Sequence, residues 1–100
     1  MLTYSGIYAG SSSVNNGSYI MQCSVPSDGT YLAIAYITGG RAWFQGVSDT
    51  TSSNYWSLAD CSGGAKILEN LTKGSVWGFN NLTGASKTYA GSHMFLIKLK

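Results

Sequence analysis

The sequence predicts a single all-β domain built as a β-sandwich or barrel, on three observations. Short segments that alternate apolar and polar residues recur along the chain, as half-buried strands do. Turn signals rich in Gly, Pro, Ser and Asn separate these segments at intervals of roughly 8–12 residues, which is typical of sandwiches and barrels. Apolar residues at helical spacing never persist for three turns, so no helix is expected. The chain has 100 residues, so one domain spanning residues 1–100 is expected.

The composition favours an ordered chain with little ionic surface. Hydrophobic residues make up 44% of the chain and charged residues 10%, whereas a disordered chain shows the opposite bias. The net charge is +2, and the basic residues do not form the stripe that a nucleic-acid partner requires. No apolar run approaches the ~20 residues of a membrane-spanning helix, and no signal peptide is evident at the start. We therefore expect neither nucleic-acid binding nor membrane insertion.

Strands are expected in eight places along the chain. These are Leu2 to Ala9, Tyr19 to Val25, Thr30 to Thr38, Arg41 to Val47, Tyr55 to Leu58, Ala65 to Asn70, Ser75 to Asn80 and His93 to Leu99. Gly39-Gly40 is predicted to be a hairpin loop, which makes Arg41 to Val47 the partner of the preceding strand. Lys73-Gly74 is predicted to join another hairpin, and Ser62 to Gly64 to form a turn.

Two of these strands, Thr30 to Thr38 and Met94 to Leu99, are apolar on both faces. In a lone two-sheet sandwich one face of each strand meets water and is polar. A second apolar face needs a second partner, and a closed symmetric homo-oligomer is the common solution. The alternative is that these faces only cover loops.

The stretch from Tyr19 to Tyr36 resembles the aromatic-x-Cys-x-Val-Pro-Gly-x-Tyr signature of the TNF-like jelly rolls, in particular the globular heads of complement and related collagen-stalked proteins. The matching residues are Cys23, Val25, Pro26, Gly29 and Tyr31, with Ser27 and Asp28 inserted between Pro26 and Gly29. Leu71 to Trp77 is similar to the family's Leu-x-x-Gly-Asp-x-Val hairpin, although Ser75 replaces the usual Asp. Phe95 to Ile97 resembles the last strand of the family.

The resemblance implies a compact TNF-like jelly-roll β-sandwich of about 8 strands that forms a homotrimer. Aromatic and aliphatic residues of one sheet would pack around the three-fold axis. The interface residues expected on this basis are Tyr31, Ala33, Tyr36, Phe95 and Ile97.

The chain shows no constellation of catalytic residues, so we expect a protein that binds rather than catalyses. The carboxylates are Asp28, Asp49, Asp60 and Glu69, and no two have the spacing of an acid–base pair. His93 is the single histidine, and no Gly-x-Ser-x-Gly elbow is present. Cys23 and Cys61 do not have zinc-site spacing, and no segment is a calcium loop. We expect no cofactor and no metal, and a buried free thiol at Cys23.

The loop from Ser48 to Trp56 is the predicted ligand site, because exposed aromatics beside amides and hydroxyls can stack on and hydrogen-bond a sugar. Its candidate residues are Asp49, Asn54, Tyr55 and Trp56. Trp43 and Trp77 lie within predicted strands and are expected in a core or an interface.

The few charges, the abundance of Gly, Ser, Thr and Asn and the lack of an evident signal peptide resemble the terminal domain of a bacteriophage tail or head fibre. Taken with the resemblance to TNF-like jelly rolls, this implies a trimeric head domain of such a fibre or of a similar surface protein, on a virion or outside the cell. Its partners would be two copies of itself and a host-surface glycan or protein. A structural trimerisation or capsid-decoration module without receptor binding is one alternative, and a secreted carbohydrate-binding module is another, because a fold does not fix a function.

Overall fold

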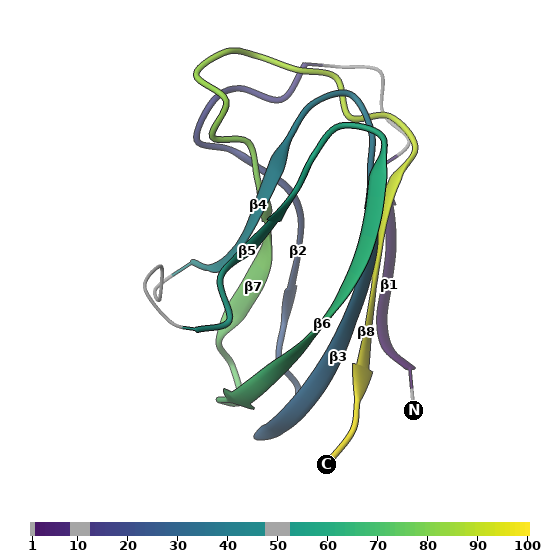
Figure 1. The fold of residues 1–100 in the computed structure, drawn as a ribbon. Helices are drawn as coiled ribbons and strands as arrows, with labels where there is room; N and C mark the ends of the chain where they lie inside the picture. The colour runs from purple at the N-terminus through teal and green to yellow at the C-terminus, as the bar shows by residue number, and fades with distance from the viewer. Residues whose placement is uncertain (1, 9–12, 48–52) are drawn as a thin grey trace.

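The computed structural model describes residues 2–8, 13–47 and 53–100, and within these ranges the chain is all β (Figure 1). The strands are β1 Leu2–Tyr8, β2 Tyr19–Ser24, β3 Gly29–Ile37, β4 Ala42–Gly46, β5 Trp56–Leu58, β6 Ser62–Leu71, β7 Val76–Asn80 and β8 Ser92–Lys98. They form two four-stranded antiparallel sheets. The β3 sheet has the order β1-β8-β3-β6, and the β7 sheet has the order β2-β7-β4-β5. The predicted all-β class is confirmed, and each expected strand region contains a strand.

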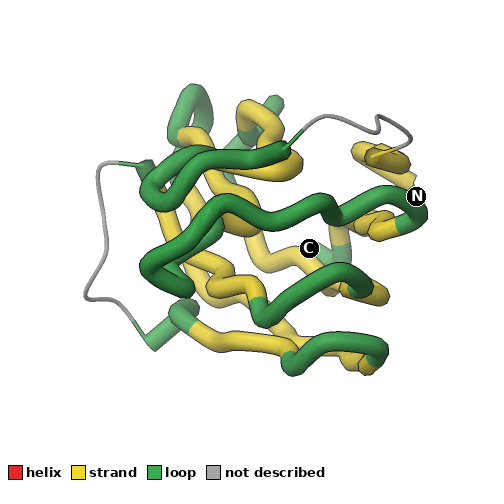
Figure 2. Tube along the Cα trace, turned by 90° about the horizontal axis from the view of Figure 1, so that it is seen from above, coloured by secondary structure: helices red, strands yellow, loops and turns green. Residues whose placement is uncertain are grey.

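The connections between the strands differ from the predicted hairpins. In the described part of the chain, β4 and β5 are the only consecutive strands that pair with each other. β3 pairs with β6 and β8, so Gly39-Gly40 carries the chain from one sheet to the other and the predicted hairpin is wrong. Lys73-Gly74 likewise joins β6 to β7 in the opposite sheet. The two crossing connections lie at opposite ends of the strands, β3 to β4 at the top of Figure 1 and β6 to β7 at the bottom. Figure 2 shows, from above, the loops that cover the upper end.

Glycine occurs in these turns because the backbone there has a positive φ, which glycine adopts readily. A hairpin and a crossing loop can both require this conformation. Gly39 has a φ of 101° and Gly74 a φ of 86°, a region that side chains disfavour. At Gly39 a Cβ would also lie 1.8 Å from the backbone oxygen of Thr88. Ser62 to Gly64, in contrast, forms no turn but begins β6, where it pairs with the end of β3.

The core lies between the two sheets and takes alternate residues from each strand. In β3 the side chains of Tyr31, Ala33, Ala35 and Ile37 are buried, while the residues between them face the other side. Phe44 is the centre of an aromatic cluster in the β7 sheet. The other buried hydrophobic residues are Val14, Ile20, Met21, Val25, Ala42, Leu58, Leu68, Leu71, Trp77, Phe79, Tyr89, Met94 and Leu96.

A bulge in β2 changes the direction of its first side chain. Tyr19 pairs with Asn80 and Met21 with Phe79, so two steps along β2 match one step along β7. The β2 backbone comes so close to β7 here that a Cβ at Gly78 would lie 2.0 Å from the Met21 oxygen. Strict alternation would place Tyr19 and Met21 on the same face, but the bulge leaves Met21 in the core and turns Tyr19 to the outer face.

Candidate functional site

The outer face of the β3 sheet carries three rows of mainly apolar residues that run across β6, β3 and β8. The strand register sets these rows, because residues that pair across neighbouring strands lie side by side on one face. From one end of the strands to the other, the rows are Ile67-Leu32-Ile97, Ala65-Ile34-Phe95 and Gly63-Tyr36-His93. We call these nine residues the apolar face.

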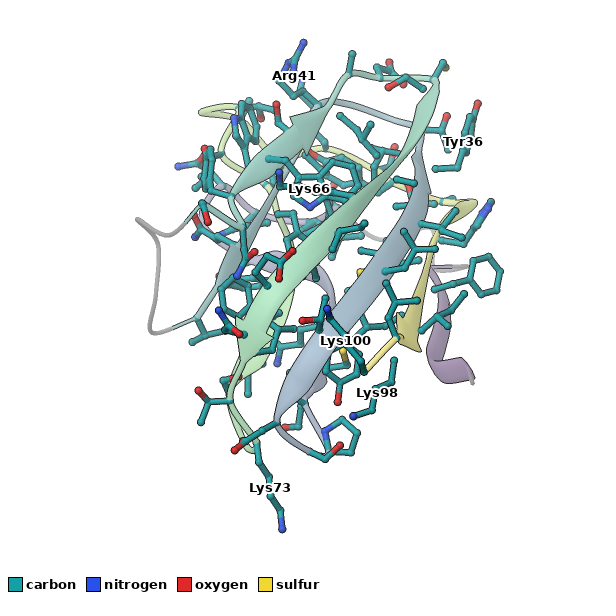
Figure 3. All side chains as sticks on the ribbon, turned by 60° about the horizontal axis from the view of Figure 1, so that its bottom comes forward. Tyr36, Arg41, Lys66, Lys73, Lys98 and Lys100 are labelled. Carbon is teal, nitrogen blue, oxygen red and sulfur yellow. The ribbon has the colours of Figure 1, made fainter. Side chains whose placement is uncertain are left out.

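The apolar face is open to solvent in the single chain. Ile34 is 38% exposed, Tyr36 36% and Ile67 51%. In contrast, the residues that alternate with Ile34 and Tyr36 in β3, Ala33, Ala35 and Ile37, are at most 3% exposed. Tyr36 projects from the β3 sheet on the side away from the other sheet (Figure 3). Large contiguous apolar patches are common at interaction sites, so this face is the candidate interaction surface.

Charged side chains lie around the apolar face rather than on it. None of its nine residues is Asp, Glu, Lys or Arg. Among the labelled lysines, Lys73 lies at one end of the molecule (Figure 3). The ionisable groups in the three rows are the imidazole of His93 and the hydroxyl of Tyr36. A partner for this face must therefore be apolar as well, because burying a charge without a counter-charge is costly.

The predicted interface residues divide between the two sides of the β3 sheet. Tyr36, Phe95 and Ile97 lie on the apolar face. Tyr31 and Ala33 do not, because the period-two alternation of β3 turns them into the core, where both are fully buried. The Tyr31 hydroxyl donates to the Ser27 oxygen at 2.6 Å, which further fixes its inward position.

Sequence reasoning missed Leu32, Ile34 and Ile67, which belong to the apolar face. The sequence of β3 contains a pattern that could have indicated Leu32 and Ile34, because alternate residues of a strand point to the same face. Leu32, Ile34 and Tyr36 therefore share one face, and Tyr31, Ala33 and Ala35 share the other. Large residues alternate with small ones after Tyr31, and in this structure the larger set faces outward.

The predicted ligand loop does not form a cluster of exposed side chains in the described residues. Asn54 is buried, accepting from the Glu69 backbone N–H at 2.8 Å and donating to the Glu69 oxygen at 3.0 Å. Trp56 packs against Phe44 with ring centroids 5.8 Å apart. Tyr55 is 41% exposed and remains available to a ligand. Asp49 lies outside the described residues.

None of the groups with a perturbed pKa is among the nine residues of the apolar face. Burial raises the pKa of Cys23 to about 11, which keeps this free thiol neutral. The Gly39 N–H donates to Asp60 at 2.8 Å and lowers the pKa of this carboxyl. Burial raises the pKa of Tyr89, whose hydroxyl donates to the Arg41 oxygen at 2.7 Å. Over residues 2–8, 13–47 and 53–100, no three His, Cys, Asp or Glu side chains gather as metal ligands would.

Within these same ranges no helix is long and apolar enough to span a membrane. A scan against models of known protein families found no match, and a search of the curated proteins found none either.

Proposed function

We propose that the protein is a non-catalytic head domain that self-associates as a homotrimer through the apolar face. The observation that carries the proposal is the uncharged character of this face across three strands. Burying apolar surface stabilises by roughly 25 cal/mol per Å². A second copy offers the same uncharged surface, and closed rotational symmetry lets every copy bury it.

The order of the strands supports a jelly-roll β-sandwich as the framework of this head. A jelly roll distributes eight strands over two sheets through long crossing connections. The orders β1-β8-β3-β6 and β2-β7-β4-β5 have this distribution, with β4 and β5 as the one consecutive pair in the described chain. In this arrangement the β3 sheet faces the three-fold axis and the β7 sheet faces outward.

Recognition of a host-surface glycan or protein is the role that we propose for the surface left free by assembly. A fibre head on a virion is the setting that the composition predicts. A trimerisation module without receptor binding is the alternative, and a ligand-binding measurement on the assembled protein distinguishes the two.

The test of self-association is sedimentation equilibrium at micromolar concentration on the wild type and on Ile34→Glu. Ile34 lies in the middle row of the apolar face, so a glutamate there would be buried without a counter-charge. We expect the wild type to have three times the mass of one chain and Ile34→Glu to be monomeric.

Gln22→Glu is the matched control, because Gln22 is exposed on β2 in the other sheet and the substitution adds the same charge. It should remain trimeric. A monomeric wild type, or an Ile34→Glu variant with the wild-type mass, would show that the apolar face is not an interface.

A further inference from the structure

The outer face of the β7 sheet carries a row of aromatic and polar side chains that crosses all four strands. Asn80 on β7 pairs with Tyr19 on β2 and with Trp43 on β4. Trp43 pairs in turn with Ser57 on β5. The row therefore runs Tyr19-Asn80-Trp43-Ser57, with an amide between two aromatic rings.

The side chains of this row point away from the core. Phe44 and Phe79, which adjoin Trp43 and Asn80 in sequence, pack against each other between the sheets with centroids 5.3 Å apart. Alternation then directs Trp43 and Asn80 to the outer face. Tyr19 joins them because of the bulge in β2.

Gln45 and Gln22 extend the polar part of this surface beside the row. They pair with Gly78 from its two sides, and Gly78 places no side chain between them. The Gln45 Nε2 donates to the Tyr19 hydroxyl at 3.2 Å, across β7. This neutral hydrogen bond is worth about 0.5–1.5 kcal/mol, so a ligand hydroxyl can replace it at little cost.

Asn80 differs from the other two buried asparagines of the described chain. Asn54 and Asn81 use both the oxygen and the nitrogen of their amides in hydrogen bonds. Asn80 is 5% exposed, and its Oδ1 is buried without a hydrogen-bond partner among the described residues. A buried acceptor without a donor costs about 1–3 kcal/mol. A donor supplied from outside the chain would remove this cost.

We propose that this surface binds a neutral saccharide. The apolar face of a sugar ring would pack on Trp43, and a sugar hydroxyl would donate to the Asn80 Oδ1. Gln22, Gln45 and the Tyr19 hydroxyl supply further neutral donors and acceptors around it.

A neutral ligand fits because the aromatic part of the row carries no ionic group. Arg41 reaches its β5 end, where its Nη1 donates to the Ser57 Oγ at 3.1 Å. Its charge therefore lies at the rim, and Arg41 projects from one end of the molecule (Figure 3). Sites that recognise anions place such a group against the ligand itself.

This inference rests on the proposed function and deepens it by naming the ligand class of the head, and its residues lie on the opposite sheet from the apolar face. Its failure is therefore separable from that of self-association. The monomeric Ile34→Glu variant should keep the single-site affinity of the wild type for a sugar.

The experiment is a printed array of neutral oligosaccharides built from glucose, galactose, mannose and N-acetylglucosamine, beside sialylated and sulfated ones. The full chain should bind neutral glycans. Titration calorimetry with a soluble form of the best-bound neutral oligosaccharide then compares variants. We expect Trp43→Ala to weaken binding about tenfold or more, and Leu99→Ala, at an exposed residue just after β8 of the opposite sheet, to have no effect.

Asn80→Leu is a second variant that distinguishes loss of a binding contact from loss of folding. It removes the unpaired oxygen, so it should leave the melting temperature unchanged or raised while binding falls about tenfold. Folded protein that binds no neutral glycan, or binds only sialylated or sulfated ones, would overturn the proposal. So would an effect of Tyr55→Ala without an effect of Trp43→Ala, which would place the ligand at the loop before β5.

Discussion

Tyr36 and His93 face each other across β3 and β8, and their rings stack with centroids 5.8 Å apart and planes 25° apart. Phe95 meets the same imidazole edge-on at 5.7 Å. The His93 Nδ1 lies 3.3 Å from the Gly91 oxygen, so the tautomer with Nδ1–H donates to it. The imidazole is thus held among aromatic rings at one end of the apolar face.

A fixed charge at this position should oppose self-association. We expect His93→Lys to raise the dissociation constant of the trimer about tenfold or more, because assembly would bury an ammonium group without a partner. His93→Phe keeps an aromatic ring against Tyr36 and should assemble at least as well as the wild type. Sedimentation equilibrium measures both. Equal dissociation constants for His93→Lys and wild type would place this end of the face outside the interface.

Asn54 should act on stability rather than on ligand binding. Its amide bonds both backbone groups of Glu69, so Asn54→Ala leaves a buried N–H and C=O unpaired and should cost about 1–3 kcal/mol. Urea unfolding measures the loss. Tyr55→Ala is the neighbouring control and should change the unfolding free energy by less than about 0.5 kcal/mol, since Tyr55 is exposed. An Asn54→Ala variant as stable as wild type would contradict the structural role of this amide.

Gly78 should not tolerate a side chain, although its backbone conformation is ordinary. The Cβ of Gly78→Ala would lie 2.0 Å from the Met21 oxygen, so β2 must move, and we expect a loss of at least about 3 kcal/mol. Gly74→Ala is the comparison. A Cβ added at Gly74 would have no atom within 4 Å, so only the φ of 86° opposes alanine there. It should cost about 1–2 kcal/mol. Thermal or urea unfolding gives both values, and a smaller loss at Gly78 than at Gly74 would refute the close approach of β2 and β7.

Cys23 should make the protein less stable at alkaline pH. Burial raises the pKa of this thiol to about 11 from an ordinary value of 9.0, so between these values the folded chain holds a proton that the unfolded chain releases. The contribution of the thiol is fully present below pH 9.0 and is lost as the pH rises towards 11. Because lysines and tyrosines also titrate in this range, the measurement is the difference in unfolding free energy between wild type and Cys23→Ala. A difference that stays constant with pH would contradict the shifted pKa.

The two cysteines should also differ in reactivity. Cys61 is exposed, whereas Cys23 is half-buried and packs against the core. A thiol reagent at mildly alkaline pH should therefore modify Cys61 first, because the thiolate is the reacting form and burial keeps Cys23 protonated. Mass spectrometry of the modified peptides identifies the order, and faster labelling of Cys23 would contradict its burial.

The sequence by itself determined the regions in which the strands lie, although it placed a turn at Ser62 to Gly64, where β6 begins. Alternation of apolar and polar residues and the backbone preferences of Gly and Pro are local properties, so they place β2, β3 and β8 to within a few residues. They also show that β3 is apolar on both faces.

The tertiary structure alone decided which strands pair and which face of each strand is buried. Gly39-Gly40 suits a hairpin and a crossing loop equally, so the sheet of β4 depends on contacts distant in sequence. β3 is apolar on both sides, and its pattern could not tell that Tyr31 points inward and Tyr36 outward. Tyr19 lies outside because of a bulge that forms only against β7. In β3 the local pattern fixes which residues share a face, and only packing against other strands fixes which way that face points. In β2 the pairing with β7 also changes which residues share a face.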